Sequence, residues 1–556
     1  MELFKKLSLL LLLSFLLPLP ALARDFTYTY EGQTLTYTVL DEEAKTCETK
    51  AGGYSSGGVA GNNISGELSI PEVAEDESGN KFTVTSIGFR SFYRCTEITG
   101  DLNIPNSVIT IGSEAFSGCS GFTGSLTIPE SVTYIAQFAF DDCSGLTGDL
   151  TIPNSVTDIG DYAFYNCSGL KGNLTISNSV TSIAGSTFSL CSGLTGDLTI
   201  PNSVTSIKGN AFSGCSGFTG DLIIPNSVTS IGNGAFYWCS GFTGSLSISN
   251  SVTSIGNGAF ENCSGFTGDL IIPESVVTIG ESAFRYCSGF NGTLTLGNSV
   301  TSIEAYAFQG CSGLTGSLII PPSVTDFGRA VFNTCSGFTG TLTIPESITD
   351  ISEWLFAGCS GFTQLSIPKS VINIGDNAFQ KCSGFTGDLI IPESVTTIGS
   401  EAFYECSGFN GSLILSSTVT EIGRYAFRNA SSFAEIQSFN PIPPSKSSDY
   451  SFFDPNIFYK NIPLYVPDGS VDAYKEAPVW GSFQKIYPLS ELITIVSPTE
   501  IKLQTTTLEL TTEETALLTA TVLPDNATYK TVTWTSSEPT VASVDASGNV
   551  TAMNLL

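Results

Sequence analysis

Histidine is absent from all 556 residues of this chain. Its absence excludes Ser-His-Asp and Cys-His nucleophilic chemistry and every metal site that needs an imidazole ligand. The chain also lacks a Cys-x-x-Cys pair, which argues against a zinc site built from thiolates. No group of acid, base and nucleophile departs from the pattern of the rest of the sequence. We therefore expect a protein that is not an enzyme and that holds no metal and no cofactor.

Positive charge is scarce. The sequence has 22 Lys and Arg against 52 Asp and Glu, which leaves a formal net charge of −30 at pH 7. A field of this sign repels phosphate backbones and anionic lipid surfaces, so we expect no nucleic-acid partner. The balance is typical of a soluble extracellular protein or of one that meets cationic partners.

Long apolar runs are missing except at the start of the chain. Residues 7–17 form an apolar run that follows Lys5 and Lys6 and precedes an A-x-A cleavage sequence at residues 21–23. This is the pattern of a secretory signal peptide. A membrane anchor is the alternative, but the run is short and ends at prolines. We expect the mature protein to be secreted or displayed on the cell surface, with no membrane insertion after signal cleavage.

A unit of 24 residues, close to CSGFTGDLTIPNSVTSIGNGAFYN, is repeated from about residue 95 to residue 430. A chain with this period forms a solenoid, in which each turn buries its apolar side against its neighbours. Each unit contains a Leu-x-Ile or Leu-x-Leu triplet, usually followed by proline, as in residues 126–129. The two apolar side chains point to one face of a short strand, and the proline ends that strand. The sequence therefore predicts a β-rich repeat solenoid with a ladder of short parallel strands.

The rest of each unit returns the chain and adds apolar residues. The Val of Ser-Val-Thr, the Ile of Ser-Ile-Gly and the Ala-Phe pair recur in nearly every copy, so we expect them to line the core. We expect the Ser-Gly after each cysteine to form a turn in which glycine supplies a free φ angle.

One unit is a residue shorter than the others and reveals a resemblance. After Cys359 the next cysteine follows at 23 residues, and Phe362, Leu365 and Ile367 then match the L-x-x-L-x-L core of a leucine-rich repeat. With the other copies aligned on this unit, the array resembles the BspA-like leucine-rich repeats of bacterial surface proteins, whose units contain I-G-x-x-A-F-x-x-C. The resemblance implies the leucine-rich-repeat fold and adhesion to host extracellular-matrix or plasma proteins, or to other bacteria.

The two ends of the array lose the period. The N-terminal segment alternates apolar and polar residues around residues 31–33, which predicts a capping hairpin. The C-terminal segment contains Tyr474 and Trp480, which we expect on a short helix that closes the last hydrophobic face. The predicted domains are a signal peptide at 1–23, an N-terminal cap at 24–66, the leucine-rich repeat solenoid at 67–430, a C-terminal cap at 431–490 and a further domain at 491–556.

That further domain has Thr-rich alternation. Leu518, Val522, Trp534, Val544 and Gly548 lie in a segment that resembles a group 2 bacterial immunoglobulin-like domain. The resemblance implies an immunoglobulin-like β-sandwich. Because one or two strands of that fold are not accounted for, we expect the domain to be truncated.

All cysteines but Cys47 occur once per unit, from Cys95 to Cys406. Stacking places neighbours about 5 Å apart, within disulfide range, so oxidation is one alternative. Side chains in a ladder point the same way, however, and Ala430 takes this position in the last unit. The pattern favours a column of buried, reduced thiols.

Two surfaces are candidates for partner binding. The two residues after the Ala-Phe pair vary between units, and four of them are large and lie within two turns of each other. An ordinary turn surface is the alternative, but aromatic residues and arginine dominate interface energetics. These residues are Tyr237, Trp238, Arg285 and Tyr286.

The second candidate is the exposed face of the Leu-x-Ile strands. It presents a long, flat array of Thr, Ser and Asp, which suits extended protein partners. A calcium ladder of the recurring aspartates is an alternative, but other copies place Ser, Thr or Asn there. The candidate residues on this face are Asp149, Thr151, Asp197 and Thr199.

Taken with the resemblance, these patterns indicate a secreted or cell-surface adhesin that binds host matrix or bacterial surface proteins through a long repeat surface. Two alternatives stay open. A glycan-binding protein would use exposed aromatics such as Trp238 and Trp354, and an envelope spacer would need no ligand.

Overall fold

The computed structural model describes residues 24–50, 64–446, 452–453, 461–492, 500–523 and 532–553. The chain divides into two compact units. The first comprises residues up to Leu464 together with Asp472–Ile486, and the second comprises Tyr465–Val471 and Tyr487–Leu556. The predicted signal peptide lies outside the described residues, and the boundaries of the predicted domains stay predictions.

The first unit begins with a mixed sheet. Strands β1 (Asp25–Tyr30), β2 (Gln33–Asp41) and β3 (Thr46–Lys50) are antiparallel. The predicted hairpin is confirmed, because Tyr30 pairs with Gln33 across its turn. β3 then pairs in parallel with β6 (Lys81–Ile87), which also pairs with β5 (Val73–Glu75). This sheet starts the array, because β6 pairs in parallel with β9 (Thr110–Ile111) of the next turn.

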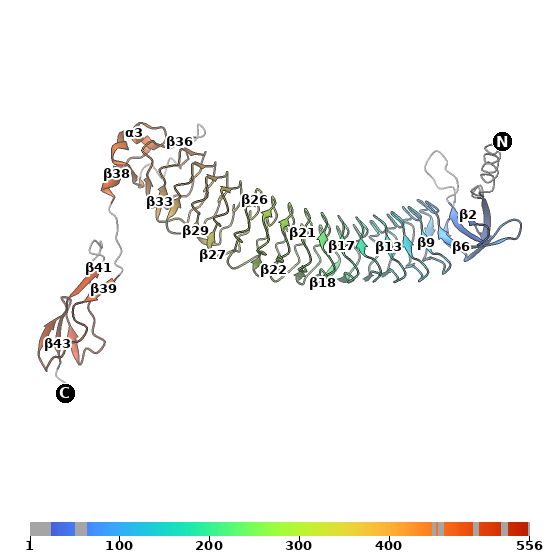
Figure 1. The fold of residues 1–556 in the computed structure, drawn as a ribbon, viewed down its shortest axis with the longest axis horizontal. Helices are drawn as coiled ribbons and strands as arrows, with labels where there is room; N and C mark the ends of the chain where they lie inside the picture. Colours follow the sequence, from blue (N-terminus) through green and yellow to red (C-terminus); the bar gives the residue numbers. More distant parts are fainter. Residues whose placement is uncertain are drawn as a thin grey trace, which may run out of the picture. The chain divides into compact units, whose positions relative to one another are not determined.

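The predicted strand of each turn is present and forms what we call the first ladder (Figure 1). Its Leu side chains are buried and the residues that follow them are exposed, as in Leu126 and Thr127. Around Leu318 only an isolated bridge, Gly316–Phe338, takes the place of a strand. After a short pair of β4 (Gly66–Glu67) and β7 (Ile98–Thr99), the strands are β8 (Leu102–Asn103), β10 (Leu126–Thr127), β12 (Leu150–Thr151), β14 (Leu174–Thr175), β16 (Gly196–Thr199), β18 (Phe218–Ile223), β20 (Leu246–Ser247), β22 (Leu270–Ile271), β24 (Leu294–Thr295), β27 (Gly340–Thr343), β29 (Phe362–Ser366), β31 (Leu389–Ile391), β33 (Ser412–Leu415) and β35 (Glu435–Ser438).

Each turn also has a second strand that the sequence pattern did not predict. It holds a polar residue and the Ile of Ser-Ile-Gly, and it forms longer sheets than the first ladder does, for example β15 through β26. Two residues suffice for such a strand because the flanking turns already hold it against its neighbours. Besides β9, the strands are β11 (Tyr134–Ile135), β13 (Asp158–Ile159), β15 (Ser182–Ile183), β17 (Ser206–Ile207), β19 (Ser230–Ile231), β21 (Ser254–Ile255), β23 (Thr278–Ile279), β25 (Ser302–Ile303), β26 (Asp326–Phe327), β28 (Asp350–Ile351), β30 (Asn373–Ile374), β32 (Thr397–Ile398), β34 (Glu421–Ile422) and β36 (Ser445–Lys446).

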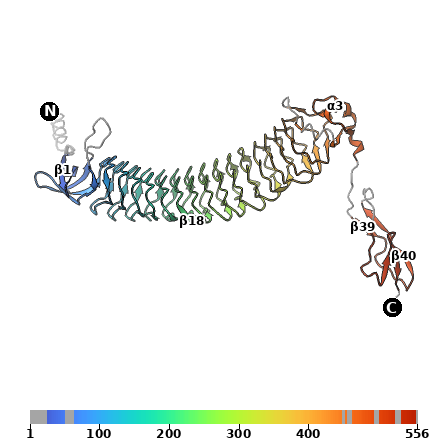
Figure 2. The ribbon, with the colours of Figure 1, turned by 180° about the vertical axis from the view of Figure 1, so that it is seen from behind.

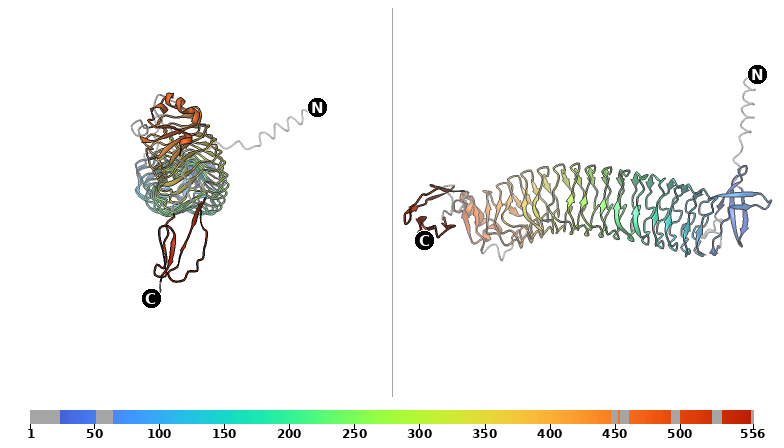
Figure 3. Two further views of the ribbon diagram at one scale, coloured as in Figure 1. Left: turned by 90° about the vertical axis from the view of Figure 1, so that its left-hand side faces the viewer. Right: turned by 90° about the horizontal axis from the view of Figure 1, so that it is seen from below.

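The turns stack in register, so that like residues form columns along the array (Figures 2 and 3). The Phe of each Ala-Phe pair is fully buried and stacks on its counterparts, with ring centroids 5.1–5.8 Å apart from Phe92 to Phe427. The Val, Ile and Ala positions are buried in the same way. The predicted core is confirmed.

The glycine of Cys-Ser-Gly has a different role from the one expected. None of these glycines adopts a positive φ, but an added Cβ would lie less than 3.0 Å from carbonyl oxygens of the preceding turn. Instead, two other residues of each turn adopt the left-handed conformation, namely the residue before Ala-Phe and the residue before Cys. Asn210 (φ 55°) and Trp238 (φ 59°) are examples.

Aromatic side chains close the C-terminal end of the first unit. The Tyr474 hydroxyl donates to the Asn440 carbonyl oxygen at 2.8 Å, and Trp480 Nε1 donates to the Pro444 carbonyl oxygen at 2.9 Å. Both rings are fully buried, as a closing role for them requires. Trp480 lies in a 3₁₀ turn and not in the helix that was expected to hold it. The segment from residue 464 to residue 491 is divided between the two units, and its elements are β37 (Leu464–Val466), α3 (Val471–Glu476), the 3₁₀ turns Asp468–Ser470, Trp480–Ser482 and Leu489–Glu491, and β38 (Ile486–Pro488).

The second unit contains two small antiparallel sheets. One pairs β39 (Glu500–Leu503) with β41 (Ala520–Leu523), and the other has the order β40 (Thr515–Leu517), β43 (Asn549–Ala552), β42 (Ala542–Val544). Among the residues described from 500 to 553, Val522 is the only buried apolar side chain.

Candidate functional site

The cysteine column belongs to the core. All cysteines are free and buried. From Cys119 to Cys406, each thiol donates a hydrogen bond to the carbonyl oxygen of the Ala-Phe phenylalanine in the preceding turn, as Cys263 does to Phe236 at 3.0 Å. Burial raises the pKa of Cys311 and Cys359 to about 12. These thiols therefore stay protonated near neutral pH and act as weak hydrogen-bond donors between turns.

The aspartates before the first-ladder strands also connect neighbouring turns. One carboxylate oxygen of Asp149 accepts a hydrogen bond from the backbone N–H of Asn173, one turn later, at 2.6 Å. Asp221 accepts from both the N–H and the hydroxyl of Ser245. These bonds lower the pKa of Asp221. The same arrangement recurs at Asp101, Asp269 and Asp388.

The exposed face of the first ladder holds the predicted residues Thr151 and Thr199, with Asp149 and Asp197 two residues earlier in their turns. This face also carries a set of three isoleucines in the same strand position as these threonines. Ile223, Ile271 and Ile319 are 61%, 54% and 73% exposed, with Ser247 and Thr295 in the turns between them. We call these three residues the isoleucine stripe.

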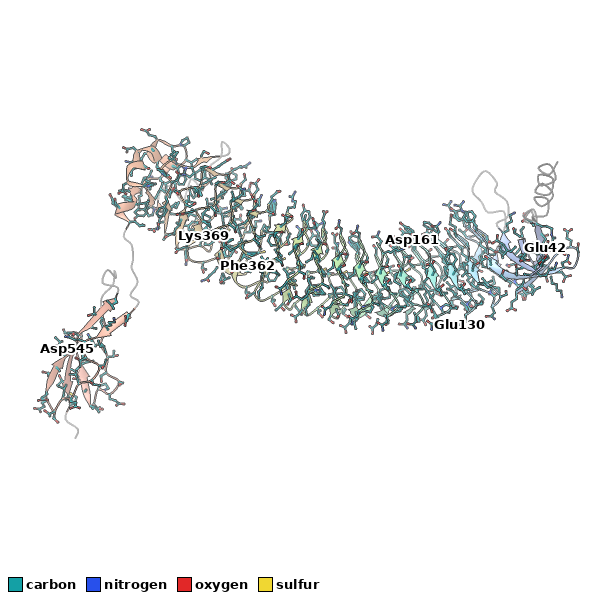
Figure 4. The ribbon with its side chains drawn as sticks, in the orientation of Figure 1. Glu42, Glu130, Asp161, Phe362, Lys369 and Asp545 are labelled. Atoms are coloured by element: carbon teal, nitrogen blue, oxygen red, sulfur yellow. The ribbon has the colours of Figure 1, made fainter. Side chains whose placement is uncertain are left out.

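An open apolar hollow of ≈ 860 Å³ lies farther along the same face. Ile390, Ile414 and Phe439 line it, with Lys369 and Glu393 at its edge. Figure 4 labels Lys369 and Phe362 in the shortened turn next to it. The sequence analysis did not identify this hollow, although consecutive isoleucines at one strand position were a signal for it.

The structure places the four aromatic and arginine candidates on one corner of the turns. The rings of Tyr237 and Trp238 are 6.1 Å apart. Two turns later, the Arg285 guanidinium lies over the ring of Tyr286 at 4.7 Å. Glu261, in the turn between, contacts Arg285 Nη1 at 3.5 Å, and its carbonyl oxygen accepts a hydrogen bond from the Trp238 N–H at 2.8 Å.

Trp354 differs from Trp238 in its surroundings. Trp238 is 56% exposed, whereas Trp354 is half-buried and its Nε1 donates to Glu353 at 3.0 Å. Trp354 is therefore the weaker of the two as a platform for a ligand.

A depression next to Tyr237 was missed by the sequence analysis. It has a volume of ≈ 380 Å³ and is lined by asparagine, glutamate, serine, glycine and Tyr237. Two successive glycines before Ala-Phe, Gly234 and Gly258, were the signal, because most other turns carry a larger side chain there.

Neither a metal centre nor a membrane span was found in the part of the chain that the structure describes. There, no three Cys, Asp or Glu side chains are grouped as metal ligands would be. Within the same ranges, no helix is long and apolar enough to cross a bilayer.

The repeat geometry agrees with a family comparison. The model of the BspA type leucine-rich repeat region matches residues 85–219, 218–339 and 339–457, which is more than half of the chain. This chain belongs to the BspA-type leucine-rich repeat family. Residues 497–555 match the group 2 bacterial Ig-like domain. A search of curated proteins finds no relative that matches the chain.

Solved structures similar to this BspA-type protein include three bacterial proteins. A leucine-rich repeat protein from Bacteroides ovatus is 22% identical, with a TM-score of 0.47, over 76% of this chain and 97% of that one. A leucine-rich cell surface protein from Faecalibacterium prausnitzii is 22% identical, with a TM-score of 0.36, over 76% and 95%. The pneumococcal vaccine antigen PcpA is 16% identical, with a TM-score of 0.34, over 83% and 98%.

The family assignment sets the class of function. BspA-type leucine-rich repeat proteins are cell-surface or secreted proteins, and such repeats generally bind other proteins. Leucine-rich-repeat and Ig-like domains are typically binding or structural domains without catalytic activity. The class of functional site to be expected in this BspA-type protein is therefore a binding surface.

Proposed function

We propose that the protein is a secreted or cell-surface adhesin that binds host matrix or bacterial surface proteins through the exposed face of the first ladder. The observation that carries this proposal is the isoleucine stripe. Its three side chains are more than half exposed, and the fold does not need them there, because neighbouring turns carry Thr or Ser at the same position.

The spacing of the stripe favours an extended partner. Its members occur at every second turn, which places them about 9.6 Å apart along the stack. One turn of a polyproline II helix spans about 9.3 Å and contains three residues. A polyproline II segment with an apolar side chain at every third residue therefore places those side chains at nearly the same spacing as the isoleucines of the stripe.

The charge of the face favours a cationic partner. Asp221 and Asp269 are exposed and lie two residues before Ile223 and Ile271. Between residues 195 and 345, Lys and Arg occur only at positions that follow the second strand of their turns, namely Lys208, Arg285 and Arg329. The occupant is thus an extended, positively charged segment of another protein, held by apolar contacts and steered by opposite charge.

A matched pair of variants tests the proposal. The stripe variant combines Ile223→Thr, Ile271→Thr and Ile319→Thr, which introduces the residue that neighbouring turns already carry. The control variant combines Ile109→Thr, Val277→Thr and Ile372→Thr, which are 44–46% exposed and also lie in a column of threonines. Solid-phase binding of the full chain to purified extracellular-matrix proteins is measured for the wild type and both variants.

We expect the stripe variant to bind at least tenfold more weakly and the control variant to bind like the wild type. A lysine-containing polyproline II peptide with leucine at every third position should compete, and a peptide of the same composition with irregular leucine spacing should not. Equal binding by both variants would refute this face as the site. No binding to any matrix protein would favour the envelope spacer.

A further inference from the structure

The residue before Ala-Phe lies at a corner of its turn and has a left-handed backbone conformation. Tyr162, Tyr306 and Trp354 occupy it in three turns, with φ of 59–61°. In two successive turns the position is held by Gly234 and Gly258, whose φ values are 61° and 60°. The backbone path is therefore unchanged, and only the side chains are missing.

The missing side chains leave the depression of ≈ 380 Å³ beside Tyr237. The depression is shallow and open to solvent, so a ligand in it is covered on one side only. An added Cβ at Gly258 would meet Glu261 Oε2 at 3.4 Å, so Gly258 forms part of the floor and Glu261 part of the wall.

Asparagine side chains on one wall are held in fixed positions. Asn233 Oδ1 accepts a hydrogen bond from the backbone N–H of Asn257 at 2.9 Å, and Asn257 Oδ1 accepts from the N–H of Glu281 at 3.1 Å. Among the residues that the structure describes, no acceptor is recorded for the Nδ2 groups of Asn233 and Asn257. Each amide thus offers two donors beside the depression without having to reorganise.

On the other wall, the positive charge of Arg285 balances the negative charge of Glu261. The Glu261 carboxylate lies 3.5 Å from Arg285 Nη1, and Arg285 is fixed in turn by a 2.7 Å hydrogen bond from its Nε to Gln309. Burial raises the pKa of Glu261. The Glu261 carboxylate can accept hydrogen bonds from hydroxyl groups of a ligand. Because Glu281 also lines the depression, a negatively charged ligand is not favoured there.

Aromatic surface completes the depression. Tyr237 lines it, and the exposed ring of Trp238 lies next to Tyr237. Trp238 occupies the left-handed position before Cys, where Gly214 and Gly310 stand in other turns, so the fold does not require a large ring there. Rigid aromatic rings give a large apolar contact with little loss of conformational freedom.

We propose that this depression binds a neutral carbohydrate. One pyranose ring fills the volume left by Gly234 and Gly258, with its apolar C–H face against Tyr237. Its hydroxyl groups accept hydrogen bonds from the amides of Asn233 and Asn257 and donate to Glu261. A second sugar extends over Trp238. The site is separate from the isoleucine stripe, so the protein has one surface for extended protein segments and another for glycans.

Two variants test the site in the full chain. Gly258→Tyr fills the depression with a residue that other turns carry at the same backbone conformation, and Asn377→Tyr is its control in a distant turn. Tyr237→Ala removes the aromatic wall, and Tyr165→Ala is its control at the same position three turns away. Circular dichroism checks the fold of each variant.

The probe is a printed array of neutral oligosaccharides, followed by isothermal titration calorimetry with the oligosaccharide that binds best. We expect Gly258→Tyr and Tyr237→Ala each to weaken binding at least tenfold, and both controls and the stripe variant to bind like the wild type. Absence of binding to any neutral oligosaccharide, a preference for sulfated glycans, or binding that persists in both variants would overturn the proposal.

Discussion

The glycine of each Cys-Ser-Gly triplet shows how closely one turn approaches the next at the level of single residues. Its hydrogen atom faces carbonyl oxygens of the preceding turn, so no other residue fits without a shift of the backbone. The sequence showed that this glycine recurs in all units but the first and the last, but not why. The expectation that this glycine supplies a free φ angle was wrong. Its actual role, to allow a close approach between turns, leaves no local sign in the sequence.

Gly241→Ala tests this explanation. The new Cβ would lie less than 3.0 Å from the carbonyl oxygens of Ser216 and Phe218, whereas in Gly209→Ala the nearest atom would be the Asn233 carbonyl oxygen at 3.3 Å. We expect Gly241→Ala to lower the free energy of unfolding by about 1–3 kcal/mol, as overpacking does. Urea denaturation followed by circular dichroism measures the difference. Equal stability of the two variants would contradict the close-approach argument.

At the level of the β-strands, the short elements depend on bonds between turns. First-ladder strands of two residues have few backbone hydrogen bonds, and the aspartate in front of them adds another by accepting from the next turn. The Leu-x-Ile pattern predicted these strands, since period-two burial is local. The second ladder was missed, because its polar residue and single Ile give no alternation to recognise.

Asp221→Ala tests the contribution of these aspartates. The folded-state pKa of Asp221 is lowered from the ordinary value of 3.8 by its bonds to Ser245. Its contribution to stability is therefore fully present above that value and is lost as the pH falls further. We expect the variant to unfold at lower urea concentration than the wild type at pH 6, with a smaller difference at pH 3. Asp197→Ala is the control, because no such bond is recorded for Asp197, and a similar pH dependence there would argue against the mechanism.

At the level of the whole array, stability passes from turn to turn through the columns of the core. Phe260 is fully buried between Phe236 and Phe284, with 5.3 Å between ring centroids on both sides. A repeat array behaves approximately as a one-dimensional chain of coupled units. Loss of one central contact therefore weakens the coupling through which the two halves of the array unfold together.

Phe260→Ala should cost about 3–5 kcal/mol at that turn. We expect the single unfolding transition to separate into two, because the coupling between the halves is weakened. Phe427→Ala, near the C-terminal end of the column, should release only the end of the array. Urea unfolding combined with hydrogen exchange by mass spectrometry locates the affected turns. A single transition with uniform exchange in Phe260→Ala would show that the coupling is not carried by this column.

The sequence by itself determined the period, the strand of the first ladder, the buried Phe, Ile, Val and Cys columns and the family. These features follow from which residues recur in each unit, and that recurrence can be read directly from the sequence. The candidate residues Tyr237, Trp238, Arg285 and Tyr286 were found because they vary where the rest does not.

Only the tertiary structure decided which contacts form between residues that lie 24 positions apart in the sequence. The hydrogen bond from Asn173 to Asp149, the contact of Glu261 with Arg285 and the depression left by Gly234 and Gly258 all lie between turns. The alignment of units says that such residues are neighbours, but distance and free volume depend on how adjacent backbones pack. The binding surfaces of this protein are therefore properties of the stack and not of any single repeat.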